Sequence, residues 1–525
     1  YDDADRKTTE TVNYPGFSKT NRYTYYKNGL KASFTGPDNI PIGYLYDSNN
    51  QLTGVQIPNV GMFTVNKYAW NRPAEETLPG GGKRLYQYDP LMRVQDIVSQ
   101  DPGDNQQLNY GYTYDKVDNI TAKQTEHGDY GFQYDNLYRL TDADNPDQPE
   151  EAFDYDRVGN RIGSADTTGP WTHNANNELE AFGNTTFQYD VNGNMIEKNV
   201  GGTITRFFYN LEDRLERVED GIGTVIATYY YDPLGRRLWK ETSGTRTYFH
   251  YSDEGLVGEY GATGTEIKTY GWKPVKTWGT DPLFMKAGAE YYWYHNDHLG
   301  TPQVMTTSSG AVVWSAKYTS FGMASVDAGS LVVNQLRFAG QYFDNETGFH
   351  YNWNRYYDPK IGRFLRLDPI GFNGGLNLYV YSKSNPLKNI DSSGLAYCVY
   401  SRFETFGTIA CTFSNNDCNC KDPFVSSSFS GNGTELSEQK YGGPIPRGTW
   451  KIDAPGSIAK HPNWAYLQPV GHSAHGRTGF FIHGPGARNL GCISFRNGRE
   501  RLMDCLKKDG GGELEVIDIG DSYMP

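Results

Sequence analysis

The chain has 525 residues and a mass of 59.1 kDa, which is too long for one ordinary hydrophobic core and favours several domains or a repeat array. Its 41 Tyr, 60 Gly and 26 Pro suit short strands with tight turns and exclude an all-α protein. The formal charge of −13 argues against nucleic acid as the main partner, and no apolar run approaches the roughly 18 residues of a membrane span.

A motif of the form aromatic-x-Tyr-Asp recurs through the first half of the chain. Its copies end at the aspartates Asp47, Asp89, Asp115, Asp135, Asp156, Asp190 and Asp232. Successive copies are separated by about 20 residues or a multiple of that step. The alternation places both aromatic rings on one face of a strand, and the Asp with the Gly and Asn that follow it turns the chain back. We therefore predict β-hairpins of about 20 residues that pair edge to edge into a continuous sheet.

The Tyr and Asp residues of this motif are expected to be structural. Tyr supplies bulk and a hydroxyl that can form its own hydrogen bond, whereas Asp holds the turn. Sugar binding by exposed aromatic side chains is the weaker alternative. Because Tyr1 lies within a repeat-like stretch, we interpret the chain as a piece of a longer protein.

These motifs resemble the tyrosine-aspartate repeats of Rhs and teneurin-type proteins, over about residues 1–395. The resemblance implies a mainly β fold in which the hairpins spiral into a hollow shell around a passenger. The segment Tyr294–Pro302, YHNDHLGTP, resembles the strand-turn signature of that family. Its two histidines, His295 and His298, are accordingly expected to be structural, and a metal site there is the weaker alternative.

Residues 337–395 closely resemble the Rhs repeat-associated core, which closes the end of the shell. In relatives the core is also an aspartic autoprotease, and the resemblance assigns Asp368 of DPIG and Asp391 of DSSGL to that role. Two close carboxylates cannot both ionise, so one keeps a proton as the acid while the other activates water. The alternative is that both aspartates cap turns. Ser392 stands where the family has Pro, which bears on the efficiency of cleavage.

The same resemblance places the cleavage between Leu395 and Ala396. Either Arg355 or Arg366 is expected to bias the carboxylate pair by its charge, with Arg355 as the preferred candidate. Asp358 of YYDP is interpreted as a turn residue rather than a third catalytic carboxylate.

The composition changes after Leu395, since all six cysteines follow it: Cys398, Cys411, Cys418, Cys420, Cys492 and Cys505. We predict three parts: a repeat shell at 1–336, the core at 337–395, and a C-terminal toxin domain at 396–525. The last part has nearly balanced charge, so the shell carries nearly all of the negative excess. Disulfides are a better interpretation of the clustered cysteines than zinc, because a second cysteine pair with zinc spacing is missing.

A histidine and a cysteine flank a glycine-rich loop in this last part. An apolar strand ends at His483, and Gly491-Cys492 opens the next apolar segment. A hairpin-like loop would bring His483 and Cys492 side by side, where the imidazole could activate the thiol and the Gly491 amide could face an oxyanion. The alternative is a buried structural cysteine or a disulfide partner.

Together with the upstream segment Gly442–Ile452, this motif resembles L,D-transpeptidase-like domains, particularly type VI secretion effectors. The resemblance implies Cys492 as nucleophile, His483 as general base, and the Gly491 and Cys492 amides as the oxyanion hole. The substrate would be the tetrapeptide stem of peptidoglycan, in L,D-carboxypeptidase or L,D-transpeptidase exchange chemistry. Candidate substrate-binding residues are His472, His475, Arg477 and Arg488.

The combined prediction is a secreted antibacterial Rhs toxin whose core cleaves itself and whose C-terminal enzyme acts in the periplasm of the target bacterium. Expected partners are the peptidoglycan stem peptide, a cognate immunity protein, and a spike or chaperone of the secretion machinery. Nucleic acid, a membrane span, a metal and a cofactor are not expected. Two alternatives are a Cys/His peptidase or amidase that cuts another bond, and a non-enzymatic adhesion protein built from the same repeats.

Overall fold

The structure is a computed structural model that describes residues 1–167, 169–274 and 276–395, followed by eight strands. These are described by their backbone: β36 (Val399–Phe403), β37 (Phe406–Cys411), β38 (Phe424–Ser430), β39 (Gly448–Asp453), β40 (Ala465–Val470), β41 (Phe481–His483), β42 (Ile493–Phe495) and β43 (Gly511–Asp518). Nearly all regular structure in the described residues is β, which confirms the predicted fold class. Within them, no helix has the length and apolar character needed to cross a membrane.

The first sheet has fifteen strands arranged in sequence order, each antiparallel to the next. They are β1 (Thr9–Tyr14), β2 (Phe17–Tyr25), β3 (Lys31–Thr35), β4 (Pro41–Tyr46), β5 (Leu52–Ile57), β6 (Gly61–Ala69), β7 (Arg72–Thr77), β8 (Lys83–Tyr88), β9 (Val94–Gln100), β10 (Gln106–Tyr114), β11 (Ile120–Thr125), β12 (Gly128–Tyr134), β13 (Leu140–Asp144), β14 (Glu151–Tyr155) and β15 (Arg161–Ser164).

The second sheet has sixteen strands, again in sequence order. They are β16 (Thr172–His173), β17 (Leu179–Phe182), β18 (Thr185–Tyr189), β19 (Met195–Val200), β20 (Thr203–Tyr209), β21 (Leu215–Asp220), β22 (Val225–Tyr231), β23 (Arg237–Thr242), β24 (Thr245–Tyr251), β25 (Leu256–Tyr260), β26 (Glu266–Trp272), β27 (Pro282–Ala287), β28 (Glu290–Asn296), β29 (Pro302–Thr307), β30 (Val312–Tyr318) and β31 (Ala324–Val326).

Each aromatic-x-Tyr-Asp motif ends one strand and starts the turn to the next, which confirms the predicted hairpins. In β12 the residues Tyr130 and Phe132 are buried while Gln133 between Phe132 and Tyr134 is exposed, as the two-residue period of a strand requires. The following Asp135 Oδ1 accepts hydrogen bonds from the amides of Leu137 (2.9 Å) and Arg139 (3.0 Å). The predicted role of Asp as the residue that holds the turn is therefore confirmed.

In several copies the tyrosine of the motif links its hairpin to the one before it. Tyr134 Oη donates to the carbonyl of Ile120 at 2.7 Å, and Tyr231 Oη donates to the carbonyl of Leu215 at 2.6 Å. The same type of bond joins Tyr88 to Pro73, Tyr114 to Val94, and Tyr209 to Met195. A half-buried ring is thus fixed at its polar end by a backbone acceptor 14 to 20 residues earlier.

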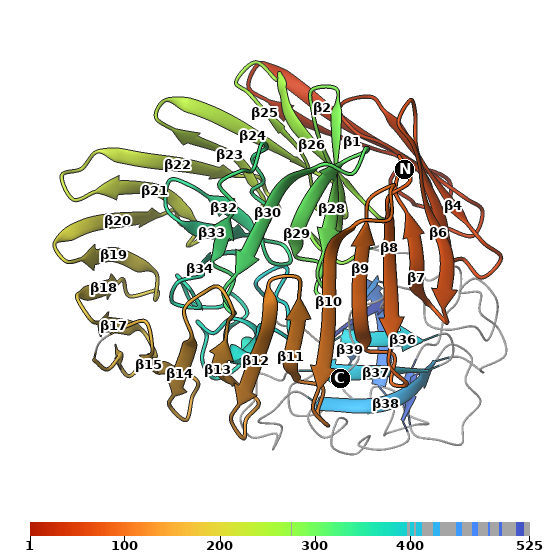
Figure 1. Cartoon of the computed structure of the whole chain (residues 1–525). Coiled ribbons are helices and arrows are strands. Elements are labelled where there is room, and N and C mark those ends of the chain that lie inside the picture. Colours follow the sequence, from red (N-terminus) through yellow and green to blue (C-terminus); the bar gives the residue numbers. More distant parts are fainter. Residues whose placement is uncertain are drawn as a thin grey trace.

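The two sheets curve so that the second half of the second sheet lies beside the first sheet (Figure 1). Hydrogen bonds and ion pairs run in the same order along both sheets: Tyr14 to Phe249, Glu76 to Lys273, and Asp147 to Lys317. One buried apolar cluster includes Phe63 of the first sheet and Trp293 of the second. This arrangement is a spiral of hairpins, as the family resemblance implies, although the hairpins form two sheets rather than the one continuous sheet that the repeat pattern predicts.

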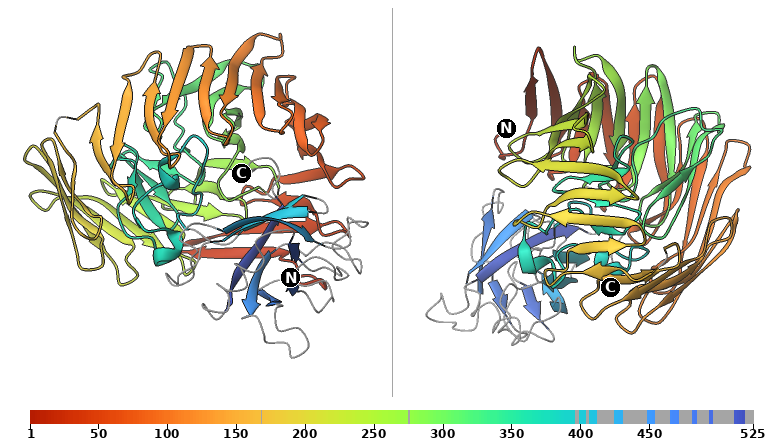
Figure 2. Two further views of the ribbon diagram at one scale, coloured as in Figure 1. Left: turned by 90° about the horizontal axis from the view of Figure 1, so that it is seen from below. Right: turned by 90° about the vertical axis from the view of Figure 1, so that its left-hand side faces the viewer.

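A four-stranded core sheet lies inside the curve of the two large sheets (Figure 2). Its elements are β32 (Tyr342–Asp344), β33 (Phe349–Asn352), β34 (Arg355–Asp358) and β35 (Arg363–Phe364), followed by the short 3₁₀ turns η1 (Gly371–Gly374) and η2 (Ser382–Ser384). Asp344 pairs with Arg237 of the second sheet, and Asn385 Nδ2 donates to Asn119 Oδ1 of the first-sheet region at 2.9 Å. The core segment is thereby attached to both sheets.

The eight strands after residue 395 form a closed barrel in the order β36-β37-β38-β42-β41-β40-β39-β43. Strand β39 contains residues 448–452 of the predicted entry strand, and it pairs with β40 and β43. Strands β41 and β42 are neighbours but run parallel, with His483 opposite Ser494. The predicted hairpin-like arrangement of these two strands was wrong, because parallel strands require a crossover rather than a tight turn.

Candidate functional site at the end of the core

The end of the core segment brings Arg355, Asp368 and Asp391 together. Arg355 begins β34, Asp368 follows β35, and Asp391 follows η2. Arg355 Nη2 lies 3.0 Å from Asp368 Oδ2 and 3.0 Å from Asp391 Oδ2. One guanidinium therefore bridges two carboxylates that are 23 positions apart in the sequence, as the motif resemblance predicts.

Burial governs the electrostatics of this triad. The side chains of Arg355, Asp368 and Asp391 are 2%, 6% and 16% exposed, and the Arg355 guanidinium lies 3.5 Å above the centre of the Phe364 ring. Burial raises the pKa of both carboxyls above the usual range, with Arg355 opposing the shift. Burial likewise lowers the pKa of Arg355, and the two carboxylates oppose this shift. One positive charge cannot balance two negative ones, so one carboxyl of the pair is poised to hold a proton.

The chain segment after Asp391 is held by backbone and side-chain contacts. Asp391 Oδ1 accepts from the amides of Gly394 and Leu395, the latter at 3.1 Å. Asn352 Nδ2 donates to the Asp391 carbonyl at 2.7 Å, and Asn354 Nδ2 donates to the Ser393 carbonyl at 3.0 Å. Hydrogen bonds from the turn between β33 and β34, together with those of Asp391, thus hold residues 391–395 in place.

Gly340 packs directly against this segment. It has a φ of +73°, and a Cβ placed there would come within 1.9 Å of the Ser392 carbonyl oxygen. Its own amide donates to the Gly279 carbonyl at 2.9 Å. A side chain at this position would displace residues 391–395, the junction segment that precedes the C-terminal part. Glycine is therefore required both for its conformation and for its size.

The other candidates near the triad have different partners. Arg366 Nη2 donates to the Asn354 carbonyl at 2.9 Å, and Arg355 rather than Arg366 pairs with the carboxylates. Asp358 forms an ion pair with Lys198 at 2.8 Å and accepts from the Lys360 amide, which confirms its interpretation as a turn residue.

The two histidines of the strand-turn signature do not share a ligand. His295 Nε2 is 2.9 Å from Thr306 Oγ1, whereas His298 Nε2 is 2.8 Å from the carbonyl of Leu387 and its ring packs on Tyr112. Burial lowers the pKa of both rings, so both are neutral. Their roles in packing β28 and β29 against the rest of the fold are structural.

Most of the predicted C-terminal site lies outside the described residues. His483 is placed at the end of β41 by its backbone. The other residues of that site, which are His472, His475, Arg477, Arg488, Gly491 and Cys492, are not among the described ones, and neither is Ala396. The cysteine–histidine pair and the disulfides therefore stay predictions.

Sequence reasoning missed the residues that hold the junction. Asn352 and Asn354 flank Trp353 in the turn NWNR, and Trp353 has a left-handed φ of +44°, which is unusual for a large side chain. Two asparagines at the tip of a hairpin are ordinary turn residues, so their spacing alone carries no signal. Their contacts to residues 391–393 span 39 positions, which only tertiary structure reveals.

Comparisons with known proteins support the shell. The sequence profile described as Teneurin YD-shell matches residues 105–387. The chain is 34% identical over 348 residues to "Double-stranded DNA deaminase toxin A" of Burkholderia cenocepacia, covering 59% of this chain and 24% of that protein. It is 27% identical over 435 residues to "Probable deoxyribonuclease RhsB" of Dickeya dadantii, covering 76% of this chain and 28% of that protein.

A solved structure shares the fold. The "Crystal Structure of TcdB2-TccC3 without hypervariable C-terminal region" matches with a TM-score of 0.60 and 20% identity, over 72% of this chain and 22% of that one. The chain thus spans about a quarter of the length of these relatives. The profile match lies wholly before Leu395, so it concerns the sheets and the core sheet rather than the barrel.

These comparisons correct the predicted enzyme class. The relatives are named as a deaminase and a deoxyribonuclease, not as L,D-transpeptidases, carboxypeptidases or proteases. The prediction of a cysteine enzyme of the L,D-transpeptidase type combined with a self-cleaving aspartic protease was therefore wrong. The short motif IHG…GCI carried the former, and the parallel pairing of β41 and β42 removes the hairpin on which its geometry depended.

Proposed function

The chain belongs to the teneurin YD-shell family, and on that premise we propose that it is part of a bacterial toxin whose β-shell carries a C-terminal segment directed at nucleic acid. The names of the two relatives, a DNA deaminase toxin and a probable deoxyribonuclease, support this target. The segment concerned is 396–525, which follows the matched part of the family. The shell at 1–336 and the core at 337–395 are its carrier in this proposal.

The observation that carries the proposal is the grip on residues 391–395. Asn352, Asn354 and Arg355 bond Asp391 and Ser393, and Asp391 in turn accepts from the Gly394 and Leu395 amides, immediately before the composition changes. The residues that immediately precede the C-terminal segment are therefore anchored inside the curve of the two sheets, where the core sheet lies. A carrier must hold its effector at a defined point, and this junction supplies one.

The net charge of −13 does not oppose a nucleic-acid target. Nearly all of that excess belongs to the residues before Leu395, whereas the C-terminal segment is close to neutral. A negative shell repels phosphate without preventing a small domain beyond it from binding nucleic acid. The proposed site of action then moves from the periplasm to the compartment that holds the nucleic acid. Secretion and a cognate immunity protein belong to the proposal as before.

We assign Arg355, Asp368 and Asp391 to the anchoring of this junction. Arg355 ties the two carboxylates to each other, and Asp391 in turn orders the Gly394 and Leu395 amides. For the C-terminal segment, His483 and Cys492 are kept as candidate functional residues without an assigned reaction. Selective alkylation of Cys492 in the folded chain would support an accessible, reactive thiol.

The test expresses the full chain in a bacterium and follows growth together with the integrity and base sequence of DNA and RNA. The expected result is growth arrest with strand breaks or base changes in one nucleic acid. A matched control ends at Leu395, which retains the shell and the junction but lacks the proposed effector. Cys492→Ala asks whether that cysteine is needed.

Growth arrest with intact and unaltered nucleic acids would contradict the proposed target. Absence of arrest, with full-length protein present, would contradict the toxin itself and favour the adhesion-protein alternative. Intact-mass measurement accompanies both samples, because a wild-type chain broken after Leu395 and an unbroken Asp368→Asn chain would overturn the purely anchoring role of the triad.

A further inference from the structure

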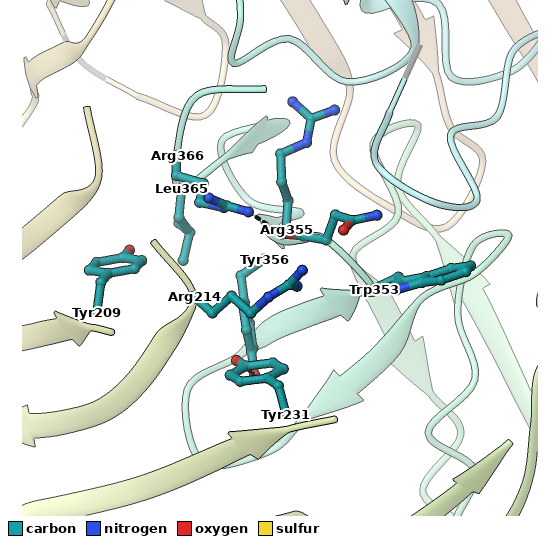
Figure 3. Close-up of a pocket in the computed structure, with 9 residues that line it drawn as sticks. Tyr209, Arg214, Tyr231, Trp353, Arg355, Tyr356, Leu365 and Arg366 are labelled. Atoms are coloured by element: carbon teal, nitrogen blue, oxygen red, sulfur yellow. Dashed lines mark hydrogen bonds between the residues drawn. The ribbon is translucent and has the colours of Figure 1, made fainter. Parts of the chain in front are cut away.

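A cavity between the second sheet and the core segment is lined by positively charged side chains. Arg214 reaches it from the turn after β20 and Arg366 reaches it from the core, which also lines it at Arg355, with Tyr209, Tyr231 and Trp353 on its walls. The cavity has a volume of about 10 Å³, which is room for about one water molecule, and it opens to solvent. Figure 3 shows the guanidiniums of Arg214 and Arg366 directed toward the same central space, while the Arg355 side chain extends away from it.

The charge of Arg355 is accounted for, whereas that of Arg366 is not. Arg355 is balanced by Asp368 and Asp391. Arg366 is 8% exposed, and within the described part of the chain its hydrogen bond goes to the neutral carbonyl of Asn354. Within the described residues, no carboxylate lies at ion-pair distance from Arg366. Burial lowers its pKa and the nearby charges of Arg214 and Arg355 add to the effect, while the Asp213 carboxylate opposes it from beyond ion-pair distance. A buried cation without a counterion is costly, and an anion would remove that cost.

Arg214 is the second cation without a close buried partner, and the repeat pattern explains why. Turns that carry Arg four residues after the motif acid form an ion pair within the turn: Asp2–Arg6, Asp89–Arg93, Asp135–Arg139 and Asp232–Arg236, with Nε to Oδ2 distances of 2.8, 2.6, 2.6 and 2.8 Å. In the turn that faces the cavity the acid is replaced by Asn210, whose Oδ1 accepts only from the backbone amides of Glu212 and Arg214. The substitution leaves the Arg214 guanidinium available.

The remaining contacts of Arg214 hold it in place without neutralising it. Arg214 Nη1 donates to the carbonyl of Gly235 at 2.9 Å, and a Cβ on Gly235 would lie 2.0 Å from Nη2. The nearest acid is Glu212, 3.4 Å from Nε, but its side chain is 73% exposed and its interaction is screened by water. A guanidinium fixed in this way offers its other N–H groups to the cavity.

We propose that this cavity is an oxyanion site, in which Arg214 and Arg366 bind one phosphate or carboxylate group between them. Guanidiniums suit such groups because their parallel N–H donors match two oxygens. The anion would join the turn after β20 to the core segment, since one cation comes from each. The tyrosine hydroxyls on the wall already donate to the carbonyls of Met195 and Leu215, so the arginines supply the specificity.

The test titrates the full-length protein with inorganic phosphate in a phosphate-free chloride buffer of constant ionic strength. Calorimetry and the tryptophan fluorescence of thermal unfolding, to which Trp353 at the cavity contributes, are the readouts. The expected result is one saturable site per chain and an unfolding temperature that rises with phosphate. A parallel titration with acetate distinguishes the source: tighter binding of acetate would support the oxyanion site and assign a carboxylate to it.

Three variants, each of which changes the net charge by the same amount, complete the design. Asn210→Asp restores the acid found in the other arginine-bearing turns and should weaken anion binding at least tenfold while keeping every arginine. Arg214→Gln should do the same. Arg246→Gln, which removes an arginine paired with Glu241 outside the cavity lining, is the control and should bind like wild type. Absence of saturable binding to wild type, or equal weakening by Arg246→Gln, would overturn the proposal.

Discussion

Two buried aspartates of the core segment should respond in opposite ways to the loss of their charge. Asp344 is fully buried between Arg237 and Lys240, with Lys240 Nζ at 2.9 Å. Burial opposes its charge, but the two cations outweigh burial and hold the pKa of Asp344 below its usual range. Asp368 shares a single arginine with Asp391, and burial raises its pKa. Asp344→Asn should therefore destabilise the fold at neutral pH, and Asp368→Asn should not.

The expected magnitudes differ by several kcal/mol. Asp344→Asn leaves Arg237 buried without its main counterion, and breaking a buried ion pair costs about 3–5 kcal/mol. That loss corresponds to about two to four powers of ten in the ratio of folded to unfolded chain. Asp368→Asn keeps an oxygen to accept from the Ile370 amide and removes one of two competing charges. Its effect at neutral pH should be stabilising or within about 1 kcal/mol of zero.

The pH dependence should also have opposite signs. The folded pKa of Asp344 lies below that of the unfolded chain, so its contribution is complete above the ordinary Asp pKa and is lost as the pH falls through the folded value. The folded pKa of Asp368 is raised, so its contribution is present below the ordinary pKa and is lost as the pH rises through the folded value. From neutral to acidic pH, wild type should lose its advantage over Asp344→Asn and gain one over Asp368→Asn.

Urea unfolding of the full-length variants, followed by tryptophan fluorescence at neutral pH and at a series of pH values that extends below the ordinary Asp pKa, measures these differences. Asp104→Asn is a matched control, because its carboxylate is 65% exposed and its pair with Lys83 is screened. Its effect should stay within about 0.5 kcal/mol. If Asp368→Asn destabilised the protein at neutral pH as strongly as Asp344→Asn, the assignment of opposite charge balances to the two sites would be refuted.

Two further predictions concern the repeats and the junction. Tyr134→Phe removes the hydroxyl that bonds the Ile120 carbonyl and should lower the free energy of unfolding by about 1 kcal/mol in the same urea assay, whereas Tyr138→Phe, at a 52% exposed ring, should leave it unchanged; equal effects would contradict the role of the hydroxyl. Gly340→Ala should displace Ser392 and speed limited proteolysis within residues 391–395. Gly348→Ala, with a similar φ of +76° but open space around it, should not. Unchanged cleavage in Gly340→Ala would show that the close packing of Gly340 does not hold the junction.

The sequence predicts the shell well because its period is short and each copy folds locally. Tyr, alternation and Asp identify a hairpin within about 20 residues, and neighbouring hairpins pair in chain order. The triad of Arg355, Asp368 and Asp391 was accessible through its motifs. The hydrogen bonds of Asn352 and Asn354 to the junction could not be predicted in this way. They join residues 39 positions apart, and asparagine is common in any turn.

The cavity and the C-terminal chemistry show two other limits of sequence reasoning. Asn210 reads as a degenerate copy of the motif until the structure places Arg214 opposite Arg366. For the C-terminal part, a histidine and a cysteine nine positions apart suggested a hairpin, but β41 and β42 run parallel. Spacing along the chain does not determine strand direction, and a short motif without its geometry does not determine a reaction.

The tyrosine-to-carbonyl hydrogen bonds have a consequence for how the number of hairpins in the two sheets can change. Each bond reaches back to the immediately preceding hairpin and no further, as from Tyr134 to Ile120 and from Tyr231 to Leu215. Removing or duplicating one complete hairpin would therefore leave each remaining tyrosine that forms such a bond with an equivalent acceptor. The sheets can thus lengthen or shorten by whole hairpins while these hydrogen bonds are kept. An insertion of a few residues inside one hairpin would instead misalign the next tyrosine and its carbonyl acceptor.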